Sequence, residues 1–240
     1  MKKISQKYCL LIFFFMVFLI NASAQQAKST SIGYVDNYAN LPKIKFEQSN
    51  ETEYNRYKKV SNLVKAKVEE NKTHFTLPTK FKKIKLKKTN QEQNDFDGYE
   101  YLGYYQRLKM YAFTENSSAE NLTFSSFGLL DSLTAHYYSI ISIGDGAVEN
   151  PIPSVNSKYL VYYYNLAYKA NSCFIGLLKV NIEGKPEQRL KEKMSFETDN
   201  FAVEEIKWVN DQCFMVKTYQ TNKVGDQRVK TFTYYKANVE

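Results

Sequence analysis

Residues 206–219, IKWVNDQCFMVKTY, carry the clearest structural signal in this 240-residue chain. Two apolar runs flank an Asn-Asp pair, and both of these residue types tolerate the positive φ that a tight turn between antiparallel strands requires. The runs are rich in aromatic and β-branched side chains, which favour strands. The stretch therefore predicts a β-hairpin whose core side chains are Trp208, Phe214 and Val216.

The same kind of pattern extends from Pro78 to the end of the chain. Short runs rich in Tyr, Phe, Val and Ile alternate with Gly, Asn, Asp and Ser, and no long helical pattern separates them. Strands joined by short turns pair antiparallel. This predicts an all-β antiparallel meander. The strands are expected at residues 80–87, 99–105, 108–114, 122–130, 135–142, 158–164, 173–180, 188–196, 203–209, 212–219 and 229–236.

Two segments precede this β domain of residues 78–240. Residues 1–24 have the parts of a secretory signal peptide: a basic start, twelve apolar residues, and small residues before a cleavage position that follows Ala24. Twelve helical residues reach about 18 Å, short of a hydrocarbon core of about 30 Å, so we expect cleavage and no membrane span afterwards. Residues 25–77 are expected to be an irregular and helical segment, with apolar spacing that predicts a helix over residues 51–70.

The signal predicts export through the secretory pathway, to the periplasm, the cell surface or the extracellular space. Cleavage lowers the net charge from +8 to +5, because three lysines leave with the signal. The remaining excess lies in residues 80–88, KFKKIKLKK. Lysines guard exposed edge strands against unwanted pairing, and we expect this role for Lys82, Lys85 and Lys87. The alternative is that these lysines bind an anion or the envelope surface. Nucleic-acid binders spread cations over a face and use Arg, so no nucleic acid is expected as a partner.

Two cysteines, Cys173 and Cys213, remain after cleavage. The exported compartment permits a disulfide between them, which would stabilise the fold by about 3–4 kcal/mol. Both residues also begin apolar runs, as buried free cysteines do. The sequence therefore leaves two alternatives: a disulfide between the two cysteines, or two buried free thiols.

The sequence contains none of the common catalytic motifs. It lacks G-x-S-x-G, H-E-x-x-H and a P-loop, and His74 and His136 are isolated, so we expect no metal site and no cofactor. A hydrolase would still need two carboxylates about 5–10 Å apart. Glu100, Asp131 and Asp145 are the candidate acids for that alternative.

Tyrosine is unusually frequent, with 20 residues, and one group stands out. In a strand, Tyr162 and Tyr164 share one face and Tyr163 points to the other. One face is expected in the core, and the opposite face could expose rings suited to binding a sugar or a protein. Tyr162, Tyr163, Tyr164 and Tyr168 are therefore the candidate ligand-binding residues. The alternative is that tyrosine simply suits a half-buried strand.

Residues 151–161, PIPSVNSKYLV, resemble the blade signature of WD-repeat-like (PD40) β-propellers, in which a P-x-x-S-P-D-G-K-x-L segment turns into a strand. Val155 and Ser157 stand where that motif has Pro and Gly. A shift of 55 residues also brings this stretch onto the hairpin at residues 206–219. The resemblance implies blade-like sheets in an incomplete, propeller-like arrangement, since three units are fewer than the four to eight of a closed ring.

The chain is also similar to small exported bacterial envelope proteins of unknown function. Together, the patterns favour an exported, non-enzymatic binding or structural protein of the cell envelope, with a protein or a glycan as its partner. The alternative is a secreted hydrolase on a propeller-like β scaffold.

Overall fold

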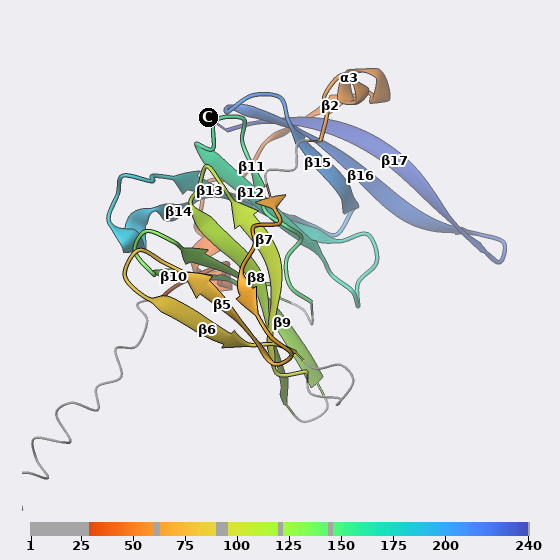
Figure 1. The fold of residues 1–240 in the computed structure, drawn as a ribbon. Helices are drawn as coiled ribbons and strands as arrows, with labels where there is room; N and C mark the ends of the chain where they lie inside the picture. Colours follow the sequence, from red (N-terminus) through yellow and green to blue (C-terminus); the bar gives the residue numbers. More distant parts are fainter. Residues whose placement is uncertain (1–28, 60–62, 90–95, 120–121, 144–145, 240) are drawn as a thin grey trace, which may run out of the picture.

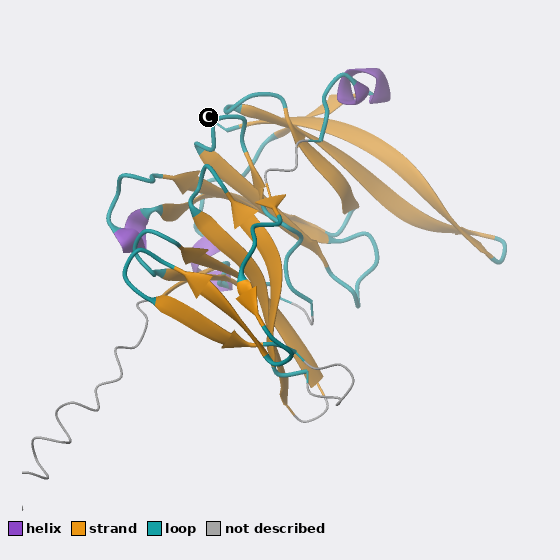
Figure 2. Ribbon diagram, viewed as in Figure 1, coloured by secondary structure: helices purple, strands orange, loops and turns teal. Residues whose placement is uncertain are grey.

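The fold was analysed in a computed structural model that describes residues 29–59, 63–89, 96–119, 122–143 and 146–239. The expected signal peptide lies outside these residues, as does Asp145. Strands dominate the described chain (Figure 2), and the helices are short: α2 (Val35–Tyr38), α3 (Glu51–Asn55) and the 3-10 turn η2 (Pro186–Gln188). None of the helices in the described ranges is long and apolar enough to cross a membrane.

The strands form four sheets (Figure 1), none of which closes into a barrel within the described residues. Sheet A has the order β1 (Ser29–Ile32), β10 (Tyr137–Ile140), β9 (Leu122–Asp131), β8 (Met110–Ala119), β7 (Gly98–Tyr105), β3 (Leu63–Val64). Sheet B has the order β11 (Ile152–Pro153), β12 (Tyr159–Asn165), β13 (Cys173–Val180), β14 (Leu190–Thr198). Sheet C has the order β15 (Ala202–Trp208), β16 (Cys213–Val224), β17 (Gln227–Asn238), β2 (Phe46–Ser49). Sheet D has the order β4 (Glu69–Glu70), β5 (His74–Pro78), β6 (Lys83–Lys87).

The expected all-β class with blade-like sheets is confirmed. Consecutive strands pair antiparallel in β7–β10, in β11–β14 and in β15–β17, and each expected strand from residue 80 onward overlaps a strand of the structure. The hairpin of residues 206–219 is β15 and β16, with Trp208, Phe214 and Val216 all buried. β1 is an exception to the antiparallel pattern, because it pairs parallel to β10.

The hydrophobic core consists of three layers between four stacked sheets. Tyr138 and Leu129 of sheet A pack with Phe174 of sheet B in the first layer. Ile175 of sheet B packs with Phe214 of sheet C in the second. The third layer joins sheets A and D and includes buried aromatic rings from both. The sheets are therefore stacked in the order D, A, B, C, and both faces of sheet B are covered.

The helix expected over residues 51–70 is wrong beyond Asn55. Asn50 caps α3 by accepting a hydrogen bond from the backbone N–H of Glu53, as an N-cap residue should. Farther along, residues 63–64 pair with the edge of β7 as β3, and residues 69–70 pair with β5 as β4. Pairing with other strands, distant in sequence for β3 and near for β4, has overridden the local helical spacing, as tertiary context often does.

The segment before Pro78 is not separate from the β domain. Its short strands belong to three sheets: β1 and β3 to sheet A, β2 to sheet C, and β4 and β5 to sheet D. The last of these, β5, pairs along its whole length with β6, across the expected boundary at residues 77 and 78. The N-terminal segment therefore completes the sheets.

The two turns related by the 55-residue shift lie against each other. Ser154 Oγ donates a hydrogen bond to Asp211 Oδ1 at 2.7 Å, and the backbone N–H of Asn156 donates to the same oxygen at 2.7 Å. These hydrogen bonds lower the pKa of the Asp211 carboxyl, although desolvation, the largest single influence, raises it. Ser157 has a φ of +58°, in the left-handed region that glycine adopts most easily. The contact fastens sheet B to sheet C at their turns.

Candidate functional site

The tyrosines expected to bind a ligand are mostly core residues. Tyr162 and Tyr164 lie in the layer between sheets A and B, and Tyr163 lies in the layer between sheets B and C. The expected exposed face of tyrosyl rings is therefore wrong, because sheet B is covered on both sides. Tyr168 lies in the turn after β12 and is 70% exposed, so a contact between its ring and a ligand stays a prediction.

The lysine stripe lies at an edge, where a guard would act. β6 is an outer strand of sheet D, and its burial alternates so that Ile84 and Leu86 pack toward sheet A. Lys85 and Lys87 are exposed on the other face, and Lys82 is exposed in the turn before the strand. Their guarding role stays a prediction.

Cys173 and Cys213 are both free and buried, so the disulfide alternative is wrong. Cys173 begins β13 within the layer between sheets B and C, and Cys213 begins β16. Burial raises the pKa of the Cys173 thiol to about 12, and burial also raises that of Cys213. Neutral, desolvated thiols of this kind act as small hydrophobic side chains and are poor nucleophiles.

Of the candidate acids of the hydrolase alternative, Glu100 and Asp131 lie within the described residues, and they occupy different environments. Asp131 is fully buried, and its Oδ2 accepts a hydrogen bond from Arg189 Nη1 at 2.5 Å while its Oδ1 accepts one from the backbone N–H of Leu133. This ion pair joins β9 to the turn before β14. Glu100 is exposed on β7. His136 Nε2 and Thr30 Oγ1 lie 2.8 Å apart, which ties β1 to β10.

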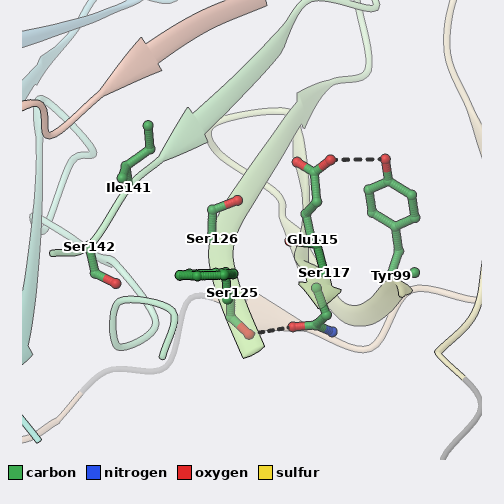
Figure 3. Close-up of a pocket in the computed structure, with 10 residues that line it drawn as sticks. Tyr99, Glu115, Ser117, Ser125, Ser126, Ile141 and Ser142 are labelled. Carbon is green, nitrogen blue, oxygen red and sulfur yellow. Dashed lines mark hydrogen bonds between the residues drawn. The ribbon is translucent and has the colours of Figure 1, made fainter. Parts of the chain in front are cut away.

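A hollow of about 310 Å³ lies at one end of sheet A and brings polar side chains together (Figure 3). We name it the Glu115 hollow. Its lining comes from β7, β8, β9 and the segment after β10, and combines one carboxylate with hydroxyl, amide, aromatic and aliphatic groups. The lining residues are Gly98, Tyr99, Glu115, Asn116, Ser117, Phe124, Ser125, Ser126, Ile141 and Ser142.

Strand register explains why these side chains meet. Glu115 of β8 is paired with Tyr99 of β7 on one side and with Ser126 of β9 on the other. Side chains of directly paired residues lie on the same face of a sheet, a few ångströms apart. In the next row, whose side chains point to the opposite face of the sheet, Asn116 Oδ1 accepts a hydrogen bond from Ser125 Oγ at 2.6 Å. The lining is therefore built on paired strands.

Two phenol groups hold the Glu115 carboxylate. Tyr99 Oη donates to Oε1 at 3.2 Å, and Tyr137 Oη of β10 donates to Oε2 at 2.7 Å. Burial, and secondarily the adjacent carboxylate, raises the pKa of Tyr99 to about 12 and raises that of Tyr137 further. Both phenols therefore remain protonated donors at neutral pH, and the carboxylate is fixed in orientation.

Aromatic packing supports this arrangement from below. The Phe113 ring stacks on Tyr137, with centroids 5.7 Å apart and planes at 12°, and meets Tyr99 edge-on at 5.7 Å. The ring lies over Gly128 of β9, where a Cβ atom would come within 2.5 Å of it. Glycine at this position thus makes room for the ring that supports both phenols.

Chemically, the hollow is suited to hydrogen bonding and not to metal coordination. Within the described ranges there is no group of three or more His, Cys, Asp or Glu side chains placed to hold a metal ion. An ionised carboxylate has about four lone-pair sites, of which the two phenols use two. The rest can accept hydrogen bonds from a bound molecule, next to the hydroxyl of Ser126, which is paired with Glu115 across the strands.

Comparison of the chain with protein-family models, curated proteins and solved structures finds no match. What the site does must therefore be argued from its own geometry.

Sequence reasoning did not identify Glu115 or the serines around it. The two phenols that hold Glu115 are 16 and 22 residues away in the sequence, and neither a motif nor a repeat links them to it. A weak signal was present in the polar run of residues 114–118, TENSS, and in Ser125 and Ser126. Polar positions that interrupt an otherwise aromatic strand indicate that its end does not lie in the core.

Proposed function

We propose that this protein is an exported, non-enzymatic glycan-binding protein of the cell envelope, and that the Glu115 hollow is its binding site. The observation that supports this most strongly is a carboxylate, oriented by two phenols, at a hollow lined with hydroxyl groups. The export in this proposal is supported by residues 1–24, which have the parts of a secretory signal peptide.

A sugar matches the hydrogen-bonding capacity of the hollow. Its hydroxyl groups can donate to the remaining lone pairs of Glu115, and hydrogen bonds to a charged acceptor are stronger than neutral ones. The Ser126 hydroxyl can both donate and accept, as sugar hydroxyls do. An apolar ligand would leave the remaining lone pairs of Glu115 desolvated without partners, which is costly.

The hollow also offers apolar surface for the C–H face of a sugar ring. Phe124 is 42% exposed, and Tyr99 is half-buried beside Glu115. Aromatic rings give a large contact area at a small cost in conformational entropy. A volume of about 310 Å³ lies at the lower end of the range of small-molecule sites, which fits one or two sugar residues better than a folded protein surface.

Binding without cleavage is favoured because glycoside hydrolysis needs two carboxyl groups about 5–10 Å apart. Glu115 is the one carboxylate among the described residues that line the hollow. Glu100 is exposed on β7 and does not line the hollow, and the Asp131 carboxylate is paired with Arg189. We therefore assign the hollow to recognition.

The test is a binding screen of residues 25–240 against a glycan array and a glycan fraction of bacterial envelopes. A saturable hit should weaken by at least about tenfold in Glu115→Gln, which preserves shape but removes the charge and one acceptor. Glu100→Gln, an exposed acid on neighbouring β7, is the matched control and should leave affinity unchanged. Thermal unfolding of both variants checks that the fold is retained.

Two results would contradict the proposal. The first is that no glycan binds. The second is a hit whose affinity is the same in Glu115→Gln as in the wild type, which would place the glycan site elsewhere. Cleavage of the bound glycan by the wild type would instead support the hydrolase alternative.

A further inference from the structure

The hairpin β16–β17 extends past the rest of sheet C as a two-stranded ribbon (Figure 1). β15 reaches along β16 only to the pair Ala202–Tyr219, and β2 reaches along β17 only to the pair Ser49–Tyr234. Residues 220–224 and 227–233 lie beyond both neighbours, and most of them are exposed on both faces. The ribbon therefore offers two faces and two edges.

One face of the ribbon is basic and aromatic. Cross-strand pairs share a face, and the register pairs Lys223 with Arg228 and Thr221 with Lys230. On the same face, Lys230 Nζ lies 3.8 Å from the centroid of the Tyr219 ring. The matching contact from Lys217 Nζ to the Phe232 ring is 4.1 Å. The opposite face holds uncharged side chains: Gln220, Asn222, Val224, Gln227 and Val229.

These cations are largely available to a partner. Lys230 also contacts Glu204, at 3.0 Å, but no acidic side chain in the described part of the chain forms an ion pair with Lys223 or Arg228. Since the cations come from both strands of the ribbon and alternate with aromatic rings, they form a face.

The two edges of the ribbon differ. A two-residue turn that includes Gly225, whose φ is +62°, closes the pair Val224–Gln227. The backbone N–H and C=O groups of this closing pair point toward each other, between the two strands. Along each strand the backbone groups of the next residue point outward, and the two orientations alternate from there. This places the outward groups of β16 beyond β15 at Thr221 and Lys223. The side-chain amide of Asn171 occupies those of Thr221, accepting from Thr221 N–H at 2.6 Å and donating to its C=O at 3.3 Å. The β16 edge is thus capped at Thr221, and only Lys223, next to the turn, keeps outward groups beyond the cap.

The same alternation places outward backbone groups of β17 at Arg228, Lys230 and Phe232. β2 would cover them if it continued in its own direction, but the chain turns into α3 after Ser49. No other described strand pairs with this stretch. A row of open hydrogen-bonding groups therefore runs beside the basic face.

We propose that this edge binds an acidic peptide segment, which adds to sheet C as an antiparallel strand along residues 228–232, in line with β2. Backbone hydrogen bonds to the edge would supply affinity, and acidic side chains at alternate positions would meet Arg228 and Lys230. A second copy of this chain is a poor occupant, because antiparallel pairing of residues 228–232 with the same residues of the second copy places Lys230 opposite Lys230, and like charges directly opposite destabilise a sheet.

The experiment uses residues 25–240 and a synthetic fluorescent peptide of alternating Glu and Thr, measured by fluorescence anisotropy at low salt. The proposal predicts saturable binding. Affinity should fall by about tenfold or more in Arg228→Gln/Lys230→Gln, and stay unchanged in Lys191→Gln, an exposed lysine on β14. The second probe is the same peptide N-methylated at the residues whose N–H groups face β17. It keeps the charge, cannot complete the strand, and should fail to bind.

Three results would overturn the proposal. One is equal binding of the N-methylated peptide, which would make the interaction purely electrostatic. Another is preference for a sulfated polysaccharide over the peptide, which would assign the basic face to an anionic polymer. A third is that neither peptide binds while the double variant aggregates, which would reduce the cations to an edge guard. The glycan test at Glu115, on sheet A, is independent of all three.

Discussion

Substitution of Gly128 by alanine tests whether the aromatic support of the Glu115 hollow is as tight as the structure implies. An added Cβ atom would lie 2.5 Å from Phe113 Cε2 and 2.9 Å from two further ring atoms. Carbon atoms in good contact are about 3.5–4.0 Å apart, so the ring would have to move by about 1 Å. Phe113 is only 2% exposed and packs between Tyr137 and Tyr99, so it has little room to do so.

The expected magnitude follows from two opposing effects. Overpacking a tight core costs about 1–3 kcal/mol. Replacing glycine also lowers the conformational entropy of the unfolded chain, which stabilises the fold by about 0.4–1 kcal/mol. The net loss in the free energy of unfolding should be about 1–2 kcal/mol, which corresponds to a fall of about 2–8 °C in Tm for a chain of this size. Displacement of Tyr137 should also weaken glycan binding.

Urea unfolding, followed by the fluorescence of Trp208, the one tryptophan of the chain, measures this change. Gly146→Ala is the matched control, because a Cβ atom there meets no heavy atom within 4 Å, and its free energy of unfolding should not fall. A Gly128→Ala variant at least as stable as the wild type would contradict the tight packing of Phe113 against Gly128. It would show that Phe113 can shift freely and does not fix the phenols.

Other predictions concern the core, the lysine edge and alkaline pH. Phe214 is fully buried between sheets B and C, so Phe214→Ala should lower the free energy of unfolding in urea by about 3–5 kcal/mol, and a loss below about 1 kcal/mol would contradict its assignment to the core. Replacing Lys82, Lys85 and Lys87 together by glutamine should raise light scattering on concentration, and unchanged solubility and salt response would exclude the edge guard. The pKa of Tyr99 is raised to about 12 by burial, whereas an unfolded tyrosine titrates near about 10. Its stabilising contribution is therefore complete below pH of about 10 and is lost as the pH rises toward 12, so tyrosinate absorbance should appear together with loss of the Trp208 signal. Appearance of tyrosinate for every tyrosine near pH 10 with the fold intact would be evidence against buried phenols.

The strands after Pro78 could be predicted from the sequence because their signal is local. Each is a short apolar and aromatic run bounded by turn residues, as in residues 206–219, and each pairs with its neighbour along the chain. The N-terminal strands carry no such signal. β1 and β3 are two to four residues long and exist because they pair with β10 and β7, more than 35 residues away. Sequence spacing alone does not reveal partners at that distance.

The burial of Tyr162, Tyr163 and Tyr164 could not be predicted for a related reason. Alternation along β12 correctly separates Tyr162 and Tyr164 from Tyr163, but it does not say how many faces of the sheet are covered. Sheet B lies between two others, so both sets of rings are buried. Glu115, in contrast, is one acid among 25 acidic residues in the sequence, and only the fold brings Tyr99 and Tyr137 to it.

A crystal structure of residues 25–240 with a bound oligosaccharide would show whether the carboxylate held by two phenols recognises a glycan. We expect a sugar hydroxyl about 2.5–3.0 Å from a carboxylate oxygen of Glu115, with Tyr99 and Tyr137 still bonded to that carboxylate. A sugar bound at another surface, with Glu115 making no contact to it, would rule out recognition by this carboxylate.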